Sequence, residues 1–296
     1  MTAAPSTPTR AGRADRLTVH ALKLIAGYRS LWAETRIGRM HMLDVRGEGP
    51  RPTAVLLHGL SSAGAHLTPL IRALRPAFAR IVAPDLPGHG LSAMPPRGTR
   101  VSDLDAGLVE ALDHVVHEHT PVVLFGNSLG GFAAIRYALA RPERVCALVL
   151  ASPGGAWMPH HEHHAFLRRF SLRTHRDALD FVDRLLAARP LARHLLALGI
   201  RRRFSRPGLR ELLDLVEHDD LLTPAELARL AMPILCLWGE RDGVLPASVA
   251  AFFKQHLPAH ARFEIPARLG HSPYLERPDV VARRIVGFVD ALGASR

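Results

Sequence analysis

Gly126-Asn127-Ser128-Leu129-Gly130 matches the pattern Gly-x-Ser-x-Gly, and its flanking residues give this pentapeptide a specific context. The apolar run 121–125 before it is typical of a buried strand, and residues 131–140 after it have the pattern of a helix. A serine between strand and helix occupies a sharp, strained turn, with its hydroxyl exposed above the edge of a sheet. Side chains at 126 and 130 would collide where strand and helix cross, hence the two glycines. We therefore predict that Ser128 is a nucleophile.

Length and composition limit the class of protein. The 296 residues suffice for one large α/β domain with an insertion or for two ordinary domains, and 48% of them are hydrophobic. No apolar run approaches the roughly 20 residues that span a bilayer. The first ten residues lack the apolar stretch of a secretory signal, so we expect a cytoplasmic protein. Cys146 and Cys236 fall in predicted strands, where we expect them to be small buried side chains.

The charge of +11 is unevenly distributed. Residues 201–210 contain five arginines and no acidic residue, yet no nucleic-acid-binding module accompanies them, so we expect no nucleic-acid partner. Residues 16–32 have the spacing of a basic amphipathic helix. We expect this helix to dock on its own domain, and peripheral contact with an anionic membrane surface is the alternative.

Strand and helix patterns alternate along most of the chain. Strands are predicted at 40–45, 53–58, 80–84, 121–125, 144–151, 233–238 and 261–266, and helices at 65–74, 103–119 and 279–292. Near-continuous apolar strands between amphipathic helices predict an α/β fold, with a mostly parallel central sheet covered by helices on both faces. Only helical patterns occur between about 155 and 228, which predicts an inserted helical cap over the carboxyl ends of the strands. The predicted division is an N-terminal tail and helix at 1–37, a core at 38–155 and 229–296, and the cap at 156–228.

A serine nucleophile needs a base, and the base needs a carboxylate to orient it. His271 follows the last predicted strand, and Asp242 follows the penultimate one. The chain order Ser, Asp, His is the one expected after a strand-turn-helix nucleophile. Glu240 is a competing carboxylate, whereas residues 152–156, after the strand that follows the nucleophile, contain none. We predict a triad of Ser128, Asp242 and His271.

The oxyanion of an acyl-transfer intermediate needs two hydrogen-bond donors. The backbone N–H of Leu129 lies at the start of the predicted helix, where the free amide and the helix dipole act together. Residues 58–62 follow an early strand, and the N–H of Leu60 is the second expected donor.

Together these motifs resemble the α/β-hydrolase superfamily over residues 38–155 and 229–294. Besides the pentapeptide, the resemblance rests on residues 57–60, 84–92, 239–242 and 270–273. It implies an α/β-hydrolase fold with no organic cofactor and no metal. It also implies that Asp85 and His89 shape the floor of the pocket rather than take part in the chemistry.

Within the superfamily, the nucleophile separates the activities. Epoxide hydrolases and haloalkane dehalogenases use aspartate where this chain has Ser128, so the resemblance implies a serine esterase or lipase acting on a small-molecule ester. C–C hydrolases of aromatic ring-fission products share the triad, but their Ser- and Gly-rich oxyanion loop matches residues 60–66 poorly. The alternatives are such a C–C hydrolase, a slow-turnover ligand-binding protein on this fold, and an interaction protein that docks acidic partners through its N-terminal basic segment.

The predicted cap contains candidates for substrate contact. Trp157 and Met158 suggest an apolar wall for an acyl group, and Asn127 is expected beside the substrate. A cap arginine such as Arg168, Arg169 or Arg173 is a candidate for binding a substrate carboxylate, with simple exposure to solvent as the alternative. The histidine-rich residues 160–164 could in principle bind a metal ion. Because no further paired ligands accompany them, we expect a solvated or lid-like role and no metal.

Overall fold

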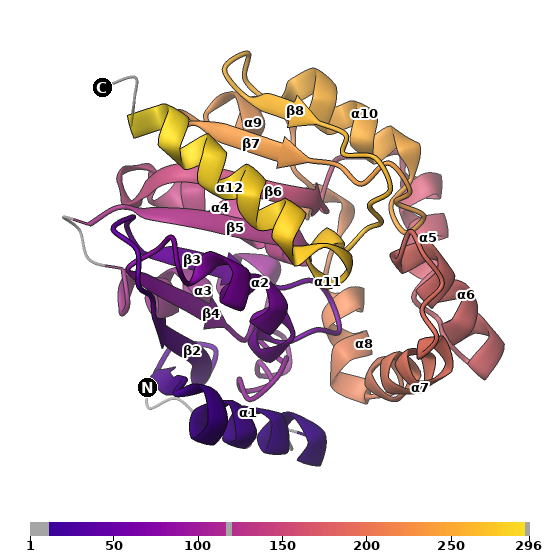
Figure 1. Ribbon diagram of the computed structural model, residues 1–296. Helices are drawn as coiled ribbons and strands as arrows, with labels where there is room; N and C mark the ends of the chain where they lie inside the picture. The colour runs from indigo at the N-terminus through magenta and orange to yellow at the C-terminus, as the bar shows by residue number, and fades with distance from the viewer. Residues whose placement is uncertain (1–11, 117–119, 294–296) are drawn as a thin grey trace, which may run out of the picture.

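The computed structural model describes residues 12–116 and 120–293. Its centre is an eight-stranded sheet with the order β1-β2-β4-β3-β5-β6-β7-β8 (Figure 1). The two pairings of β2, with β1 and with β4, are antiparallel, and all the others are parallel. This confirms the predicted mostly parallel sheet. The strands are β1 (Arg29–Ala33), β2 (Met40–Arg46), β3 (Ala54–Leu57), β4 (Arg80–Pro84), β5 (Val122–Ser128), β6 (Val145–Pro153), β7 (Ile234–Leu237) and β8 (Arg262–Glu264).

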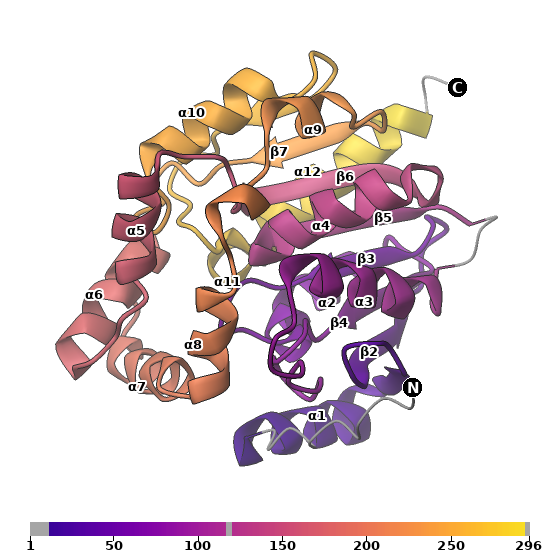
Figure 2. The same ribbon diagram turned by 180° about the vertical axis from the view of Figure 1, so that it is seen from behind.

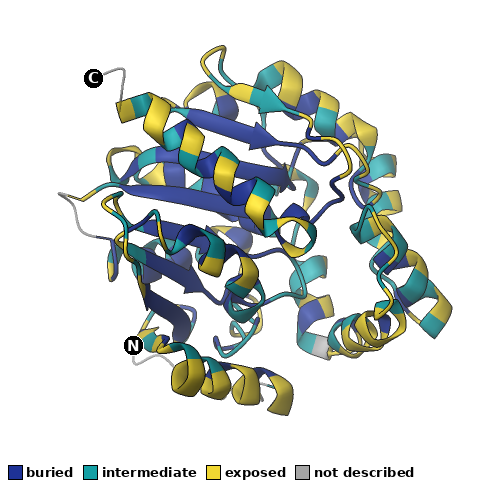
Figure 3. Ribbon diagram, viewed as in Figure 1, coloured by how far each residue is buried: buried dark blue, intermediate teal, exposed yellow. Residues whose placement is uncertain are grey.

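Helices cover both faces of this sheet. On the face seen in Figure 1 lie α2 (Thr68–Leu74) and α12 (Pro278–Gly293); on the face seen in Figure 2 lie α3 (Val101–Asp113), α4 (Leu129–Ala140) and α10 (Ala247–His256). Because the central strands are covered on both sides, every residue of β3 and β7 is buried (Figure 3). The remaining short elements of the core are η1 (Gly64–Leu67), η2 (Pro142–Arg144) and α11 (Pro273–Glu276).

The cap lies beyond the carboxyl ends of the strands, at the right of Figure 1. It consists of α5 (His160–Arg168), α6 (His175–Leu185), α7 (Arg193–Phe204) and α8 (Pro207–Asp214). These helices have an apolar core of their own, which includes Phe181 and Phe204. After η3 (His218–Asp220), however, Leu222 and Leu227 pack in the main core together with α9 (Pro224–Ala228). The end of the segment predicted as cap therefore belongs with the sheet.

The N-terminal region differs from its prediction, and residues 1–11 lie outside the described ranges. The helix expected over 16–32 is α1 (Arg13–Ala26), which ends at Gly27 with a left-handed φ of 66°. A helix that reaches a left-handed glycine stops there. The chain then forms β1, so Trp32 lies in an edge strand that pairs with β2. Within the described ranges, no helix is long and apolar enough to cross a bilayer.

The glycines around Ser128 are required by close contacts between backbones. A Cβ at Gly126 would lie 2.2 Å from the carbonyl oxygen of Gly130, and one at Gly130 would lie 2.3 Å from that of Leu57. Real Cβ atoms essentially never come so close to a backbone atom. These contacts let α4 begin directly at the nucleophile, at the tip of β5.

Asp105 on α3 leads to a prediction about stability. Its carboxylate lies 3.6 Å from Nε of Arg136. Burial raises the pKa of Asp105 to about 6, although Arg136 opposes this shift. The folded state thus holds this proton more tightly than the unfolded chain, so stability is lost as pH rises from about 4 to about 6. Asp105→Asn removes the buried charge and should raise the free energy of unfolding by about 1–2 kcal/mol at pH 8, and by about half as much at pH 5, which lies in the middle of this range.

Urea unfolding at the two pH values tests this prediction. Asp180→Asn, at an exposed position of α6, is the control and should leave stability unchanged at both. A destabilised Asp105→Asn variant at pH 8 would show instead that the ion pair with Arg136 outweighs the cost of burial.

Candidate active site

Ser128 occupies a strained backbone conformation at the junction of β5 and α4. Its φ is 55° and its ψ is −118°, a region that non-glycine residues rarely adopt. A Cβ at Gly59 would lie 3.3 Å from the Cβ of Ser128, so the loop after β3 passes directly over the nucleophile. Ser128 is also one of the residues that line a cavity beneath the cap. The predicted nucleophile thus lies at a strained junction and in the wall of this cavity.

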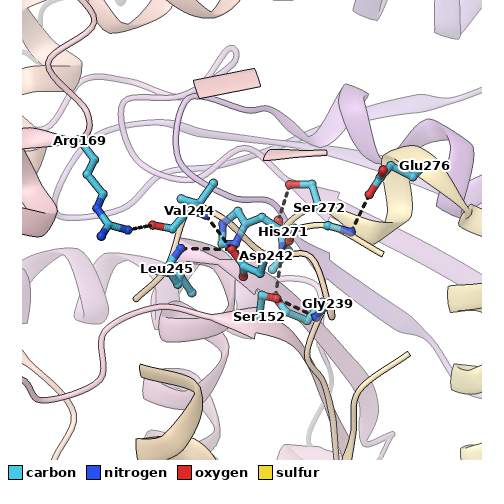
Figure 4. A network of polar contacts seen from close by, with 12 residues as sticks. Ser152, Arg169, Gly239, Asp242, Val244, Leu245, His271, Ser272 and Glu276 are labelled. Atoms are coloured by element: carbon cyan, nitrogen blue, oxygen red, sulfur yellow. Dashed lines mark hydrogen bonds and ion pairs between the residues drawn. The ribbon is translucent and has the colours of Figure 1, made fainter. Parts of the chain in front are cut away.

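The structure brings His271 and Asp242 together. Nδ1 of His271 lies 2.8 Å from Oδ2 of Asp242, and both side chains are almost fully buried. The other carboxylate oxygen, Oδ1, accepts hydrogen bonds from the amides of Val244 and Leu245, at 2.9 and 3.1 Å (Figure 4). Asp242 is thus held at both oxygens in an orientation that faces the imidazole.

The electrostatics of this pair set the tautomer of the histidine. Burial alone would raise the pKa of Asp242, but the charge and hydrogen bond of His271 and the two amides outweigh it and hold the pKa below its usual value. The carboxylate is therefore ionised at neutral pH and accepts a hydrogen bond from the N–H at Nδ1 of His271. That leaves Nε2 of His271 as the basic nitrogen.

The loop that carries His271 is fixed from two sides. Its backbone N–H donates to the carbonyl of Leu185 in the cap, at 2.9 Å, and its carbonyl accepts from Nδ2 of Asn127, at 2.8 Å. Asn127 also donates to the carbonyl of Ala151 and is 1% exposed. Contrary to the expected contact with substrate, its side chain is enclosed beside the cavity and ties the nucleophile turn to the histidine loop.

The two expected oxyanion donors belong to segments that border the same cavity. Leu129 is the first residue of α4, and Leu60 lies in the loop after β3; both line the cavity together with Ser128. The amide of Ser62 donates to the carbonyl of Gly59, at 3.2 Å, and closes a turn around Leu60. The third residue of this turn, Ser61, has a left-handed φ of 57°.

The cavity measures about 90 Å³ and is mainly apolar. Met158 lines it as expected, but Trp157 does not: its side chain is 46% exposed, and its ring packs edge-on against His218. Arg169 is engaged elsewhere, since Nη1 donates to the carbonyl of Val244 in the Asp242 loop, at 2.9 Å. The apolar lining consists of Leu60, Leu129, Phe132, Met158, Phe166, Leu167, Phe170, Leu213, Val216, Leu221 and Leu245.

Histidine side chains gather where α5 meets η3. The ring of His160 stacks on that of His218 at 3.8 Å, and His163 lines the cavity. Burial, followed by the neighbouring histidines, lowers the pKa of His163 and favours its neutral form. In the part of the chain that the structure describes, no group of three or more His, Cys, Asp or Glu side chains is arranged to hold a metal ion.

Asp85, a buried residue directly after β4, joins three segments. Its carboxylate accepts from the amides of Gly64 and Leu91 and lies 2.8 Å from Nδ1 of His41. Burial acts to raise the pKa of Asp85, but these contacts outweigh it and hold the pKa below its usual value. Asp85 is not among the residues that line the cavity, so its role in the pocket floor stays a prediction. His41 was not among the residues predicted from the sequence, where its only signal is a polar residue between apolar ones in β2.

Comparisons with known proteins agree with this geometry. The model of the alpha/beta hydrolase family matches residues 54–284. A pimeloyl-(acyl-carrier protein) methyl ester esterase of Xanthomonas campestris pv. campestris (strain B100) is 34% identical over 271 residues, which cover 86% of this chain and 100% of that protein. The protein of the same name from Nitrosomonas europaea is 30% identical over 268 residues, with the same two coverages.

Solved structures extend the likeness to nearly the whole chain. A bacterial membrane phospholipase A superposes with a TM-score of 0.78 and 25% identity, covering 94% of this chain and 91% of that one. A meta-cleavage product hydrolase from Pseudomonas fluorescens IP01 has a TM-score of 0.73 and 22% identity, covering 88% and 98%. The second likeness shows the fold alone.

Proposed function

The chain belongs to the alpha/beta hydrolase family and is a carboxylic ester hydrolase, and we propose that it works through an acyl-enzyme formed on Ser128. The observation that carries this proposal is the hydrogen bond between the side chains of Asp242 and His271. Both residues lie in loops at the same sheet edge as the strained Ser128. These are the relations required of nucleophile, base and orienting acid.

The proposed first step forms the acyl-enzyme. Oγ of Ser128 attacks the ester carbonyl while Nε2 of His271 takes the hydroxyl proton, and Asp242 stabilises the resulting imidazolium. The N–H groups of Leu60 and Leu129 hold the oxyanion. Collapse of this intermediate breaks the ester C–O bond, and His271 returns the proton to the leaving alcohol.

The second step releases the acid. Water enters the site, His271 takes one of its protons, and the hydroxide attacks the acyl carbon. The same two amides hold the second oxyanion, after which the bond to Oγ breaks and His271 returns the proton to Ser128. The reaction consumes one water and requires no cofactor.

For the substrate, we propose an ester with an apolar acyl group of short to medium length and a small alcohol. The apolar lining supports the first part, and a cavity far below the roughly 300–1,000 Å³ of common ligand pockets supports the limit on size. The relatives named as methyl ester esterases support the small alcohol.

We propose the cytoplasm as the location. Cys146 and Cys236 are thiols rather than a disulfide, which fits a reducing compartment. Peripheral contact of α1 with an anionic membrane is a further proposal, supported by its exposed Leu24 and Ile25 beside Lys23.

Hydrolysis of p-nitrophenyl esters from acetate to palmitate tests the function. Turnover with an optimum at short or medium chains is the expected result. Cleavage of a 2-hydroxy-6-oxo-dienoate without ester turnover would favour the C–C hydrolase, whose structural likeness is the reason to include this substrate. Tight binding of esters with negligible turnover would favour the ligand-binding protein.

Filling the cavity should change the chain-length preference. Val216 lines the cavity from a loop after α8, and Val216→Phe adds an aromatic ring to the space that the acyl group occupies. We expect kcat/KM for octanoate to fall by about tenfold or more, with acetate changed much less. Leu195→Phe, on the exposed face of α7, is the control. Equal losses for all chain lengths would place the acyl group elsewhere.

A further inference from the structure

Arg203 contacts three segments that are distant in the sequence. It lies in the last turn of α7 in the cap. Nη2 is 2.7 Å from Oδ1 of Asp15 on α1 and 3.1 Å from Nε2 of His66 in η1. Nη1 donates to the carbonyl of Ser61, in the loop after β3, at 2.9 Å. One guanidinium thus joins the N-terminal helix, the cap and the loop that carries Leu60. Figure 1 shows α1 and α7 along the lower side of the molecule.

These contacts form a buried ion pair rather than a surface contact. The side chains of Asp15 and Arg203 are 6% and 20% exposed, and Arg206 also approaches Asp15, at 3.5 Å. Burial lowers the pKa of Arg203 from its usual value, and Asp15 opposes that shift. A guanidinium remains charged throughout the physiological range, so it needs this carboxylate.

His66 extends the network to the next residue of the loop. Burial, followed by the charge of Arg203, lowers the pKa of His66 to about 4, so the ring is neutral at pH 7. Arg203 can only donate, so Nε2 of His66 accepts and Nδ1 carries the proton. Nδ1 then donates to Oγ of Ser62, at 3.0 Å. Arg203 therefore holds Ser61 directly and Ser62 through a histidine.

The loop needs such support because its turn is strained. Ser61 has a φ of 57°, a left-handed conformation that costs a non-glycine residue free energy and persists only when its surroundings enforce it. The preceding residue is Leu60, whose amide orientation depends on this turn. Moving a donor by about 1 Å is enough to reduce a rate substantially.

We propose that Arg203, anchored by Asp15, is a positioning residue that fixes the turn presenting the Leu60 amide to the oxyanion. The inference rests on the proposed function, since it assigns Leu60 the role stated there. Its consequence is that the N-terminal helix contributes to catalysis. Removing α1 is therefore expected to lower turnover, in addition to removing any contacts that the exposed face of α1 makes with a membrane or a partner.

The test compares Arg203→Gln, Arg203→Lys and Asp15→Asn with Arg202→Gln, which changes an exposed arginine of the same helix. For a p-nitrophenyl ester, we expect Arg203→Gln and Asp15→Asn to lower kcat by about 10- to 100-fold, less than the complete loss of a donor, with KM changed less than about twofold. Arg203→Lys keeps the charge but has no planar fork for three acceptors, so an intermediate loss is expected. Arg202→Gln should match the wild type.

A second readout separates positioning from a general loss of structure. A trifluoromethyl ketone adds to Ser128 and places its oxyanion at the donors, so its inhibition constant should rise by the same factor as kcat falls. The affinity of the product carboxylate should stay constant. All assays run well below the unfolding midpoint of each variant, and Arg203→Lys and Asp15→Asn provide the test if Arg203→Gln does not fold.

The possible results distinguish the role of Arg203 from the esterase activity itself. Folded variants with wild-type kcat, or with losses confined to KM, would overturn the role of Arg203 while leaving the esterase assignment intact. If the wild-type protein hydrolyses no ester, or if its hydrolysis persists when Ser128 is replaced, the proposed function itself is overturned.

Discussion

Replacing Ser128 by alanine is expected to lower kcat for ester hydrolysis by at least about 10⁴-fold. The variant has no oxygen to form the acyl-enzyme, and whatever remains comes from the oxyanion donors and from binding alone. The affinity for the acyl group should persist, because the cavity walls are apolar and come mainly from the cap and α4. Steady-state turnover of the best p-nitrophenyl ester, with product binding measured by calorimetry, checks both parts.

The fold should tolerate this change. Alanine keeps the Cβ that already fits at φ 55°, so the strain of the turn is unaltered. Ser205→Ala, at an exposed position after α7, is the matched control. Residual activity within tenfold of the wild type would contradict the assignment of Ser128 as the nucleophile. A large fall in the unfolding midpoint of Ser128→Ala would mean that its lost activity reflects lost stability.

Asp242→Asn is expected to lower kcat by about 10⁴-fold with a nearly unchanged structure. The amides of Val244 and Leu245 already donate to Oδ1, so the asparagine oxygen should occupy that place. Its NH₂ group then faces His271 and donates to Nδ1. The proton of the neutral imidazole moves to Nε2, which can no longer accept the proton of Ser128.

Glu240→Gln is the matched control for this prediction. Glu240 is the other carboxylate of the same loop, but its Oε2 accepts from the amide of Arg268 rather than from the triad. The variant should keep nearly full activity. If Glu240→Gln lost activity and Asp242→Asn retained it, Glu240 rather than Asp242 would be the acid that orients His271. Rates and unfolding midpoints of both variants, measured side by side, give the answer.

The sheet and the placement of the catalytic candidates could be predicted because their signals are local. Ser128 ends an apolar strand, Asp242 and His271 lie in the loops after the last two strands, and parallel strands bring their carboxyl ends to one edge. The role of Asn127 had no such signal. Its two carbonyl partners lie 24 and 144 residues away, so only the folded chain reveals that it holds the histidine loop.

The boundaries were harder to predict than the elements. The apolar spacing at 16–32 continues past the end of α1, because Leu31 and Trp32 of the strand that follows fall where a continued helix would also place apolar residues. Gly27 was the available signal for the break. At the other boundary, Leu222 and Leu227 look like cap residues in the sequence and are core residues in the structure.

The hydrogen bonds between the cap and the catalytic loops affect how this protein can be re-engineered. Leu185 and Arg184 accept, through their carbonyls, from the amides of His271 and Gly243, and Arg169 donates to Val244. A chimaera that exchanged all of residues 156–220 for a foreign insert would remove these supports from both loops. Specificity is better altered by transplanting α8 and its following loop alone, since the α5–α6 half of the cap also serves as scaffold for the base and the acid.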